Sequence, residues 1–165
     1  MKYLWTEDTG AGLHFWKLVN QLFFDNALVV ESKESNQGIL YSLTSLNAKE
    51  EDEYYIAFDY VPDNQDIRNK YRQLKQLVEK SEAKIIILDM ICVEYFILAF
   101  DKLVSWTGTG KTDKIKMRED ILAAIEDHRI DLSKIKNQTT MQYLSGFKRY
   151  STERVMKSLV GELTE

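Results

Sequence analysis

The sequence predicts an α/β fold: a four-stranded, largely parallel sheet flanked by helices, followed by a helical C-terminal third. Two observations predict it. Short apolar runs rich in β-branched and aromatic residues alternate with longer segments in which apolar residues recur at helical spacing. The alternation then stops: after Leu88 the sequence shows helical patterns and no further strand-like run. Alternating strands and helices favour right-handed crossovers, with helices on both faces of the sheet.

Four strands are expected in the first half of the chain. The third, Tyr54-Tyr-Ile-Ala-Phe58, is bounded by Asp59 and a turn that contains Pro62, the only proline. The fourth, Lys84-Ile-Ile-Ile-Leu88, is strongly β-prone in composition. The strands are expected at 3–6, 27–30, 54–58 and 84–88.

Helices are expected between these strands and throughout the rest of the chain. Asn64 is placed to cap the long amphipathic helix that follows the third strand. The C-terminal segment is expected to be one or two helices, broken near 146–151. We expect an α/β core over 1–105 and a helical extension, packed on that core, over 106–165. The expected helices span 13–24, 39–46, 65–82, 91–106, 117–128 and 138–163.

Composition restricts the class of protein. The apolar content of 44% allows a full core without covalent staples, and the single cysteine, Cys92, excludes an internal disulfide. Acids at Asp89 and Glu94 interrupt the longest apolar run, and the N-terminus has no signal-peptide pattern, so we expect a cytoplasmic protein without a membrane span. A net charge of -4 argues against nucleic-acid binding through global charge but leaves a local basic face open.

Carboxylates stand at the predicted strand ends. Glu7, Asp59 and Asp89 each follow a strand, and the carboxyl ends of parallel strands meet at one edge of a sheet. Carboxylate oxygens suit Mg²⁺ or Mn²⁺ better than zinc. The alternative is that these acids only start helices, where the helix dipole favours negative charge. The sequence therefore predicts either a metal site at this edge or a set of helix-start acids.

Four segments carry a resemblance to a known family. They are Trp5-Thr-Glu-Asp-Thr-Gly-Ala-Gly12, Ser35-Asn-Gln-Gly-Ile-Leu-Tyr-Ser-Leu43, Ile56-Ala-Phe-Asp-Tyr-Val-Pro-Asp63 and Cys92-Val-Glu-Tyr-Phe-Ile-Leu98. Together they resemble Toprim domains, most closely those of the overcoming-lysogenization-defect type and related bacterial Toprim-like proteins. These domains carry Glu on the first turn and Asp-x-Asp on the third strand. Here Val61 replaces the second Asp of that motif.

The resemblance implies a metal-dependent nuclease. It implies Glu7 and Asp59 as catalytic residues and as ligands of Mg²⁺ or Mn²⁺. Asp63, which lies beyond the broken motif, and Asp89, at the end of the fourth strand, are expected as further ligands of the same metal. Contact with nucleic-acid substrate is expected from Lys33, Lys111 and Glu94, the lysines by neutralising phosphate charge.

A second interpretation is a non-catalytic protein-interaction module on the same fold. The broken Asp-x-Asp motif, the acidic net charge and the helical C-terminal third, which would bind the partner, support it. A phage or mobile-element context suits either interpretation, and the sequence leaves the oligomeric state open. The segment Ser105–Thr112 also resembles the end of a P-loop, but Ser105 replaces its first glycine, which favours an ordinary glycine turn.

Overall fold

A computed structural model describes residues 1–107 and 109–164, with the side chains of Leu103 and Trp106 left undescribed. The contacts divide the chain into two compact units. The first contains residues 1–60 and 66–90, and the second contains residues 61–65 and 91–165. The boundary expected between residues 105 and 106 falls inside the second unit.

The first unit is built on a four-stranded parallel sheet. Its strands are β1 (Lys2–Thr6), β2 (Val29–Ser32), β3 (Glu53–Ala57) and β4 (Lys84–Ile87), arranged in the order β2-β1-β3-β4. Every pairing is parallel, with Leu4 of β1 opposite Val30 on one side and Tyr55 on the other. The predicted α/β fold is therefore confirmed, and all four carboxyl ends lie along one edge.

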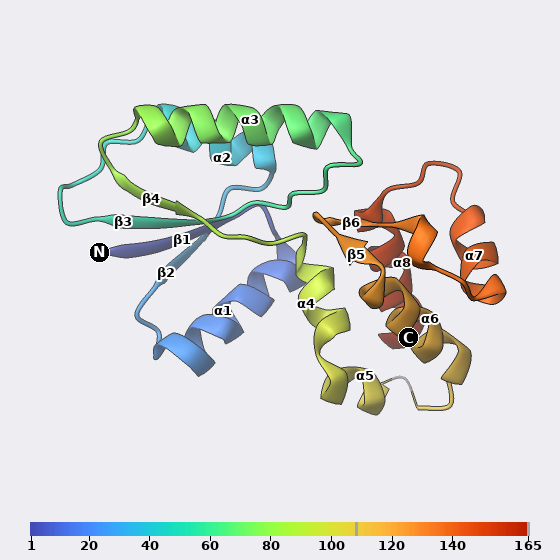
Figure 1. The fold of residues 1–165 in the computed structure, drawn as a ribbon. Coiled ribbons are helices and arrows are strands. Elements are labelled where there is room, and N and C mark those ends of the chain that lie inside the picture. Colours follow the sequence, from blue (N-terminus) through green and yellow to red (C-terminus); the bar gives the residue numbers. More distant parts are fainter. Residues whose placement is uncertain (108, 165) are drawn as a thin grey trace. The chain divides into compact units, whose positions relative to one another are not determined.

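Helices cover both faces of this sheet, as expected (Figure 1). Helix α1 (Gly10–Phe24) lies against one face, and α2 (Asn36–Thr44) and α3 (Gln65–Lys80) lie against the other. The α2–α3 side holds the main core of the unit, because alternate residues of β1 and β3 point towards these helices. The buried members of that core are Trp5, Ile39, Leu40, Leu43, Tyr54, Ile56, Phe58 and Leu74.

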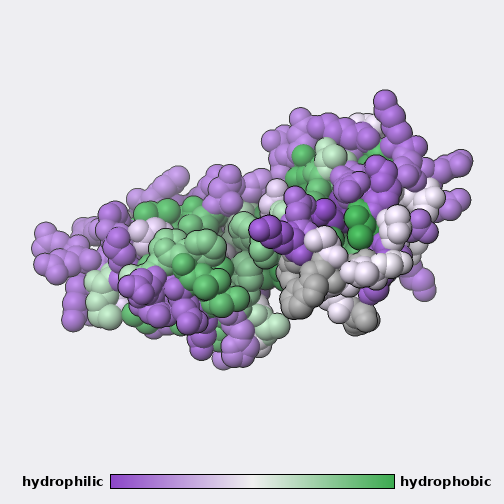
Figure 2. Space-filling view, turned by 90° about the horizontal axis from the view of Figure 1, so that it is seen from below, coloured by the Kyte–Doolittle hydropathy of each residue, from purple (hydrophilic) through white to green (hydrophobic). Residues whose placement is uncertain are grey.

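Helix α1 buries little of its apolar surface. Its fully buried residues are Trp16 and Asn20. Four apolar residues in its C-terminal half are at least half exposed. Figure 2 shows the molecule from the α1 side, and apolar atoms gather there over the first unit. The exposed residues are Leu18 (51%), Leu22 (64%), Phe23 (75%) and Phe24 (50%).

The second unit is mainly helical, as the sequence predicts. Its core forms around the last helix, which buries Val155, Met156, Leu159 and Leu163 and packs against three earlier helices. These four residues recur at helical spacing, which explains the single buried stripe. The helices are α4 (Val93–Ala99), α5 (Asp101–Thr107), α6 (Thr112–Ala123), η1 (Leu132–Lys134), α7 (Gln138–Ser145) and α8 (Thr152–Thr164).

Two expectations for this unit were wrong. The helix expected over 91–106 is broken at Phe100, whose ψ of 89° leaves the helical region and separates α4 from α5. The helix expected over 117–128 ends at Ala123, and a short hairpin follows. Strands β5 (Ile125–Glu126) and β6 (Arg129–Ile130) pair antiparallel, so the last third does contain strands.

The hairpin forms because its two central residues adopt left-handed backbone angles. Asp127 has φ 49° and His128 has φ 63°. A two-residue hairpin turn with two positive φ values matches the twist of the flanking strands, and Asp and His tolerate this region better than most residues. The pair Asp-His is a weaker hairpin signal than Asn-Gly, which explains why a helix was predicted here.

Candidate functional site

The candidate site lies at the carboxyl edge of the sheet and contains Glu7, Asn36 and Asp59. Glu7 follows β1, Asp59 follows β3, and Asn36 is the first residue of α2. The backbone N–H of Asn36 donates to Oε2 of Glu7 over 3.2 Å, and its side-chain Nδ2 donates to the carbonyl oxygen of Asp59 over 3.4 Å. One residue therefore contacts both predicted catalytic positions.

Burial distinguishes this edge from an ordinary solvated loop. Asn36 is 4% exposed and Asp59 is 3% exposed. The amide oxygen Oδ1 of Asn36 is buried and, among the described residues, has no hydrogen-bond partner. Native proteins pair almost all buried polar atoms, so such an atom calls for an explanation.

The loop before α2 holds Asn36 in place. The side chain of Ser35 caps the helix by accepting a hydrogen bond from the backbone N–H of Gly38 over 3.0 Å. Gly38 lies so close to the preceding chain that a Cβ there would be 1.8 Å from the carbonyl oxygen of Lys33. The segment Ser-Asn-Gln-Gly thus packs tightly enough to fix the first turn of α2 beside Glu7.

Asp8, the neighbour of Glu7, has a structural role. Its Oδ2 accepts hydrogen bonds from Thr6 Oγ1 over 2.6 Å and from Trp16 Nε1 over 2.9 Å. These bonds join the end of β1 to the middle of α1. The second acid of the first turn is therefore used to hold the turn itself, which leaves Glu7 as the acid of this turn that reaches α2.

Asp89 lies just beyond β4 and is exposed. The pKa of the Tyr71 phenol is raised, first by burial, then by the neighbouring Tyr60, and then by the charge of Asp89. Asp89 therefore acts electrostatically on the α3 side of the first unit. Its role as a metal ligand stays a prediction.

Asp63 belongs to the second unit. Its Oδ2 accepts hydrogen bonds from the backbone N–H of Thr152 over 2.8 Å and from the Thr152 hydroxyl over 2.6 Å. Thr152 is the first residue of α8, so the Asp63 carboxylate satisfies a helix N-terminus, where negative charge is favoured. The same hydroxyl accepts from the backbone N–H of Ile130 over 3.0 Å.

A cavity of about 410 Å³ adjoins Asp63 in the second unit. Tyr150 also lines it, and burial, followed by the charge of Asp63, raises the pKa of this phenol to about 12. The Tyr150 hydroxyl therefore stays protonated at neutral pH. The remaining lining residues are Glu126, Asp127, Arg129, Ile130, Asp131, Leu132 and Ser133.

The predicted substrate contacts all have structural partners or helix positions. Lys33 pairs with Glu31, with Nζ 2.8 Å from Oε2, and lies 4.2 Å above the ring of Trp5. Lys111 donates to the carbonyl oxygen of Glu162 over 2.7 Å. Glu94 lies in the first turn of α4. The P-loop-like segment includes Gly108, which lies outside the described residues. Substrate contact by these side chains stays a prediction.

No preformed cluster of metal-binding side chains is present in the part of the chain that the structure describes: no three His, Cys, Asp or Glu residues are grouped to hold an ion. Amide and carbonyl oxygens also bind hard cations. The candidate oxygen ligands at this edge are therefore the carboxylates of Glu7 and Asp59 and the amide of Asn36.

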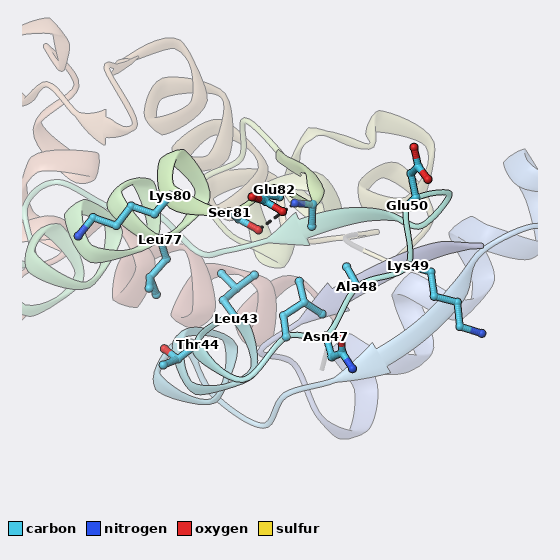
Figure 3. Close-up of a pocket in the computed structure, with 12 residues that line it drawn as sticks. Leu43, Thr44, Asn47, Ala48, Lys49, Glu50, Leu77, Lys80, Ser81 and Glu82 are labelled. Carbon is cyan, nitrogen blue, oxygen red and sulfur yellow. Dashed lines mark hydrogen bonds between the residues drawn. The ribbon is translucent and has the colours of Figure 1, made fainter.

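A cavity of about 760 Å³ lies at the opposite, amino edge of the same sheet. Figure 3 shows its lining: Leu43 and Thr44 at the end of α2, Leu77 and Lys80 at the end of α3, and the loops that follow. Lys49, Lys80, Glu50 and Glu82 also line it, and Figure 3 shows the two lysines pointing away from each other. The side chains suited to binding a hard cation therefore lie at the carboxyl edge rather than in this cavity.

No protein-family model matches the chain, and neither the curated proteins nor the solved structures contain a match. Within 1–107 and 109–164, no helix is long and apolar enough to cross a membrane. The first unit is thus defined by its own geometry, as an α/β domain with an all-parallel sheet and acids at the carboxyl edge. Its resemblance to Toprim domains stays a prediction.

Sequence reasoning missed Asn36. The signal available was its position, since it follows the second strand and precedes a helix, where α/β proteins often place ligand-contacting groups. The predicted ligands were all charged residues, so the neutral amide of Asn36 was not among them.

Proposed function

We propose that the first unit binds a divalent cation, Mg²⁺ or Mn²⁺, at the carboxyl edge of its sheet and acts on nucleic-acid phosphodiesters in the manner of a Toprim-like nuclease. Glu7 and Asp59 are the protein's main contributors. The observation that carries this proposal is the bridge through Asn36, which contacts Glu7 over 3.2 Å and Asp59 over 3.4 Å.

The chemistry of the donor set fits such a cation. Carboxylates and amides are hard oxygen donors, and Mg²⁺ in proteins usually takes few carboxylates and completes its shell with water and substrate phosphates. A bound cation would supply Lewis-acid stabilisation of the phosphoryl oxygens. The Asn36 N–H orients the carboxylate of Glu7, which is then placed to hold the cation or to accept a proton from an attacking water.

Replacement of either acid by its amide is expected to weaken metal binding. Glu7→Gln and Asp59→Asn each remove a charge with little change in shape, so we expect Mn²⁺ affinity to fall by about 10-fold or more. Isothermal titration of the full chain with MnCl₂ measures this effect. Nicking of supercoiled plasmid in Mg²⁺ or Mn²⁺ is expected in the wild type and absent in both variants.

Glu34→Gln is the matched control. Glu34 is an exposed carboxylate in the same loop as Asn36, two residues before it, and its substitution removes the same charge. Its Mn²⁺ affinity is expected to equal that of the wild type. Wild-type affinity and nicking in Glu7→Gln and Asp59→Asn would show that these acids are not the site.

A second candidate function, protein binding without catalysis, is favoured by the exposed apolar residues of α1. Leu18, Leu22, Phe23 and Phe24 each expose at least half of their surface. Contiguous apolar surface is uncommon on monomeric proteins and often marks an interface.

Polar substitution of the exposed apolar residues of α1 tests protein binding as the function. The first partner to examine is a second copy of the chain. Leu22 and Phe23 are exposed, so the double variant Leu22→Gln/Phe23→Gln is expected to keep the wild-type stability within about 0.5 kcal/mol. It is expected to reduce self-association in sedimentation velocity. A wild-type chain that stays monomeric at high concentration would exclude a homodimer through α1.

A further inference from the structure

The buried amide oxygen of Asn36 is the feature that carries a further inference. The side chain is almost fully enclosed, at 4% exposure, and Oδ1 has no hydrogen-bond partner among the residues described here. Leaving a buried polar atom without a partner is destabilising. We therefore expect this atom to have a partner from outside the chain.

The orientation of the amide follows from its surroundings. Nδ2 donates to the carbonyl oxygen of Asp59, and a carbonyl can only accept. Rotation of the amide by half a turn would place two oxygen acceptors against each other. Oδ1 is therefore fixed on the side of the amide that does not contact Asp59, and it remains available as an acceptor or as a ligand.

We propose that Asn36 Oδ1 is a direct ligand of the cation, so that two carboxylates and one neutral amide hold a single divalent ion. This inference rests on the proposed function, because it assigns a third ligand to the same site. The backbone N–H of Asn36 contacts the Glu7 carboxylate and its side chain contacts the main-chain carbonyl of Asp59, so both neighbours position the residue.

The charge of the proposed ligand set indicates how many ions bind. Glu7 and Asp59 supply two negative charges, which balance one divalent cation, and Asn36 adds an oxygen without charge. A two-metal mechanism needs further oxygen ligands to hold both ions. Asp63, one candidate for that role, is hydrogen-bonded to the first residue of α8. We therefore expect a stoichiometry of one Mn²⁺ per chain.

Substitutions at Asn36 test this assignment through metal affinity rather than activity. Asn36→Ala removes the ligand, so the Mn²⁺ affinity is expected to fall about 10-fold. Asn36→Asp keeps the shape but turns a carboxylate oxygen towards the Asp59 carbonyl, so the metal-free variant is expected to be less stable than the wild type. Its Mn²⁺ affinity is expected to rise about 10-fold, because ligand charge tunes affinity at such sites. Isothermal titration gives affinity and stoichiometry, and circular dichroism verifies that each variant is folded.

Asn47→Asp is the matched control. Asn47 is exposed and lines the cavity at the opposite, amino edge of the sheet, so the same chemical change there is expected to leave Mn²⁺ affinity unchanged. A general effect of one added negative charge would raise the affinity of both Asp variants equally, and that result would overturn the ligand assignment.

The outcomes separate this inference from the proposed function. If Glu7→Gln weakens Mn²⁺ binding while Asn36→Asp and Asn36→Ala bind like the wild type, the site stands, Asn36 is not a ligand and a buried water satisfies its oxygen. If the wild type binds no Mn²⁺ at millimolar concentration, both the proposed function and the ligand assignment are wrong. The two variants change the side chain in different ways, so either one that remains folded decides the question.

Discussion

Gly38→Ala is expected to destabilise the first unit by about 3 kcal/mol or more, as a severe case of overpacking. A Cβ at this position would lie 1.8 Å from the carbonyl oxygen of Lys33, a main-chain atom that no side-chain rotation can move away. The first turn of α2 would have to shift, and with it the cap between Ser35 and Gly38. Urea denaturation followed by far-UV circular dichroism measures the change.

Gly161→Ala is the control for this substitution. Gly161 lies inside α8, and apart from its chain neighbours and the nearby backbone of that helix, no described atom lies within 4 Å of a Cβ built there. Alanine favours a helix by about 1 kcal/mol over glycine, so this variant is expected to be as stable as the wild type or more stable. If both variants lost similar stability, the close approach of Gly38 to Lys33 would not be the cause.

Arg118→Met is expected to destabilise the second unit by about 2–3 kcal/mol. The Arg118 side chain is 8% exposed, and its Nε donates to the carbonyl oxygen of Leu98 over 2.5 Å. Leu98 is near the end of α4, where carbonyl groups lack helical partners. Methionine keeps much of the apolar stem but leaves this buried carbonyl without its donor. Thermal and urea denaturation measure the loss.

Asp101→Asn separates the two contacts of this arginine. Asp101 also pairs with Arg118, but the aspartate side chain is 86% exposed, and exposed ion pairs contribute under about 1 kcal/mol. We expect Asp101→Asn to change the free energy of unfolding by less than Arg118→Met does. The reverse order would mean that the ion pair, rather than the hydrogen bond to Leu98, stabilises the junction of α4 and α5.

The parts of the fold that could be predicted are those with strong local patterns. The run of isoleucines in β4 and the helical spacing of α3 specify their structures almost independently of context. Phe100 and the Asp127-His128 turn could not be predicted in this way. Near Phe100, the hydrogen bond from Arg118 to Leu98 is a tertiary contact that a local pattern does not reveal. The hairpin depends on two positive φ angles that the pair Asp-His does not specify.

The candidate site was predictable only in part. Parallel topology places Glu7 and Asp59 at one edge, and both positions follow from the strand ends alone. The sequence contains no sign that Asp8 is bonded to Trp16 or Asp63 to Thr152, because those partners are 8 and 89 residues away. Asn36 was missed because its importance comes from burial, which a polar residue type does not predict.

The division of the chain has a consequence for its modularity. Residues 61–65 belong to the second unit, although the chain before and after them belongs to the first. A fragment that starts at residue 91 would lose Asp63, and with it the acceptor of both hydrogen bonds from Thr152. A fragment that ends at residue 90 would keep Asp63 without that helix. A single cut between the two units therefore always separates residues 61–65 from the rest of the second unit, and the Asp63–Thr152 hydrogen bonds are lost.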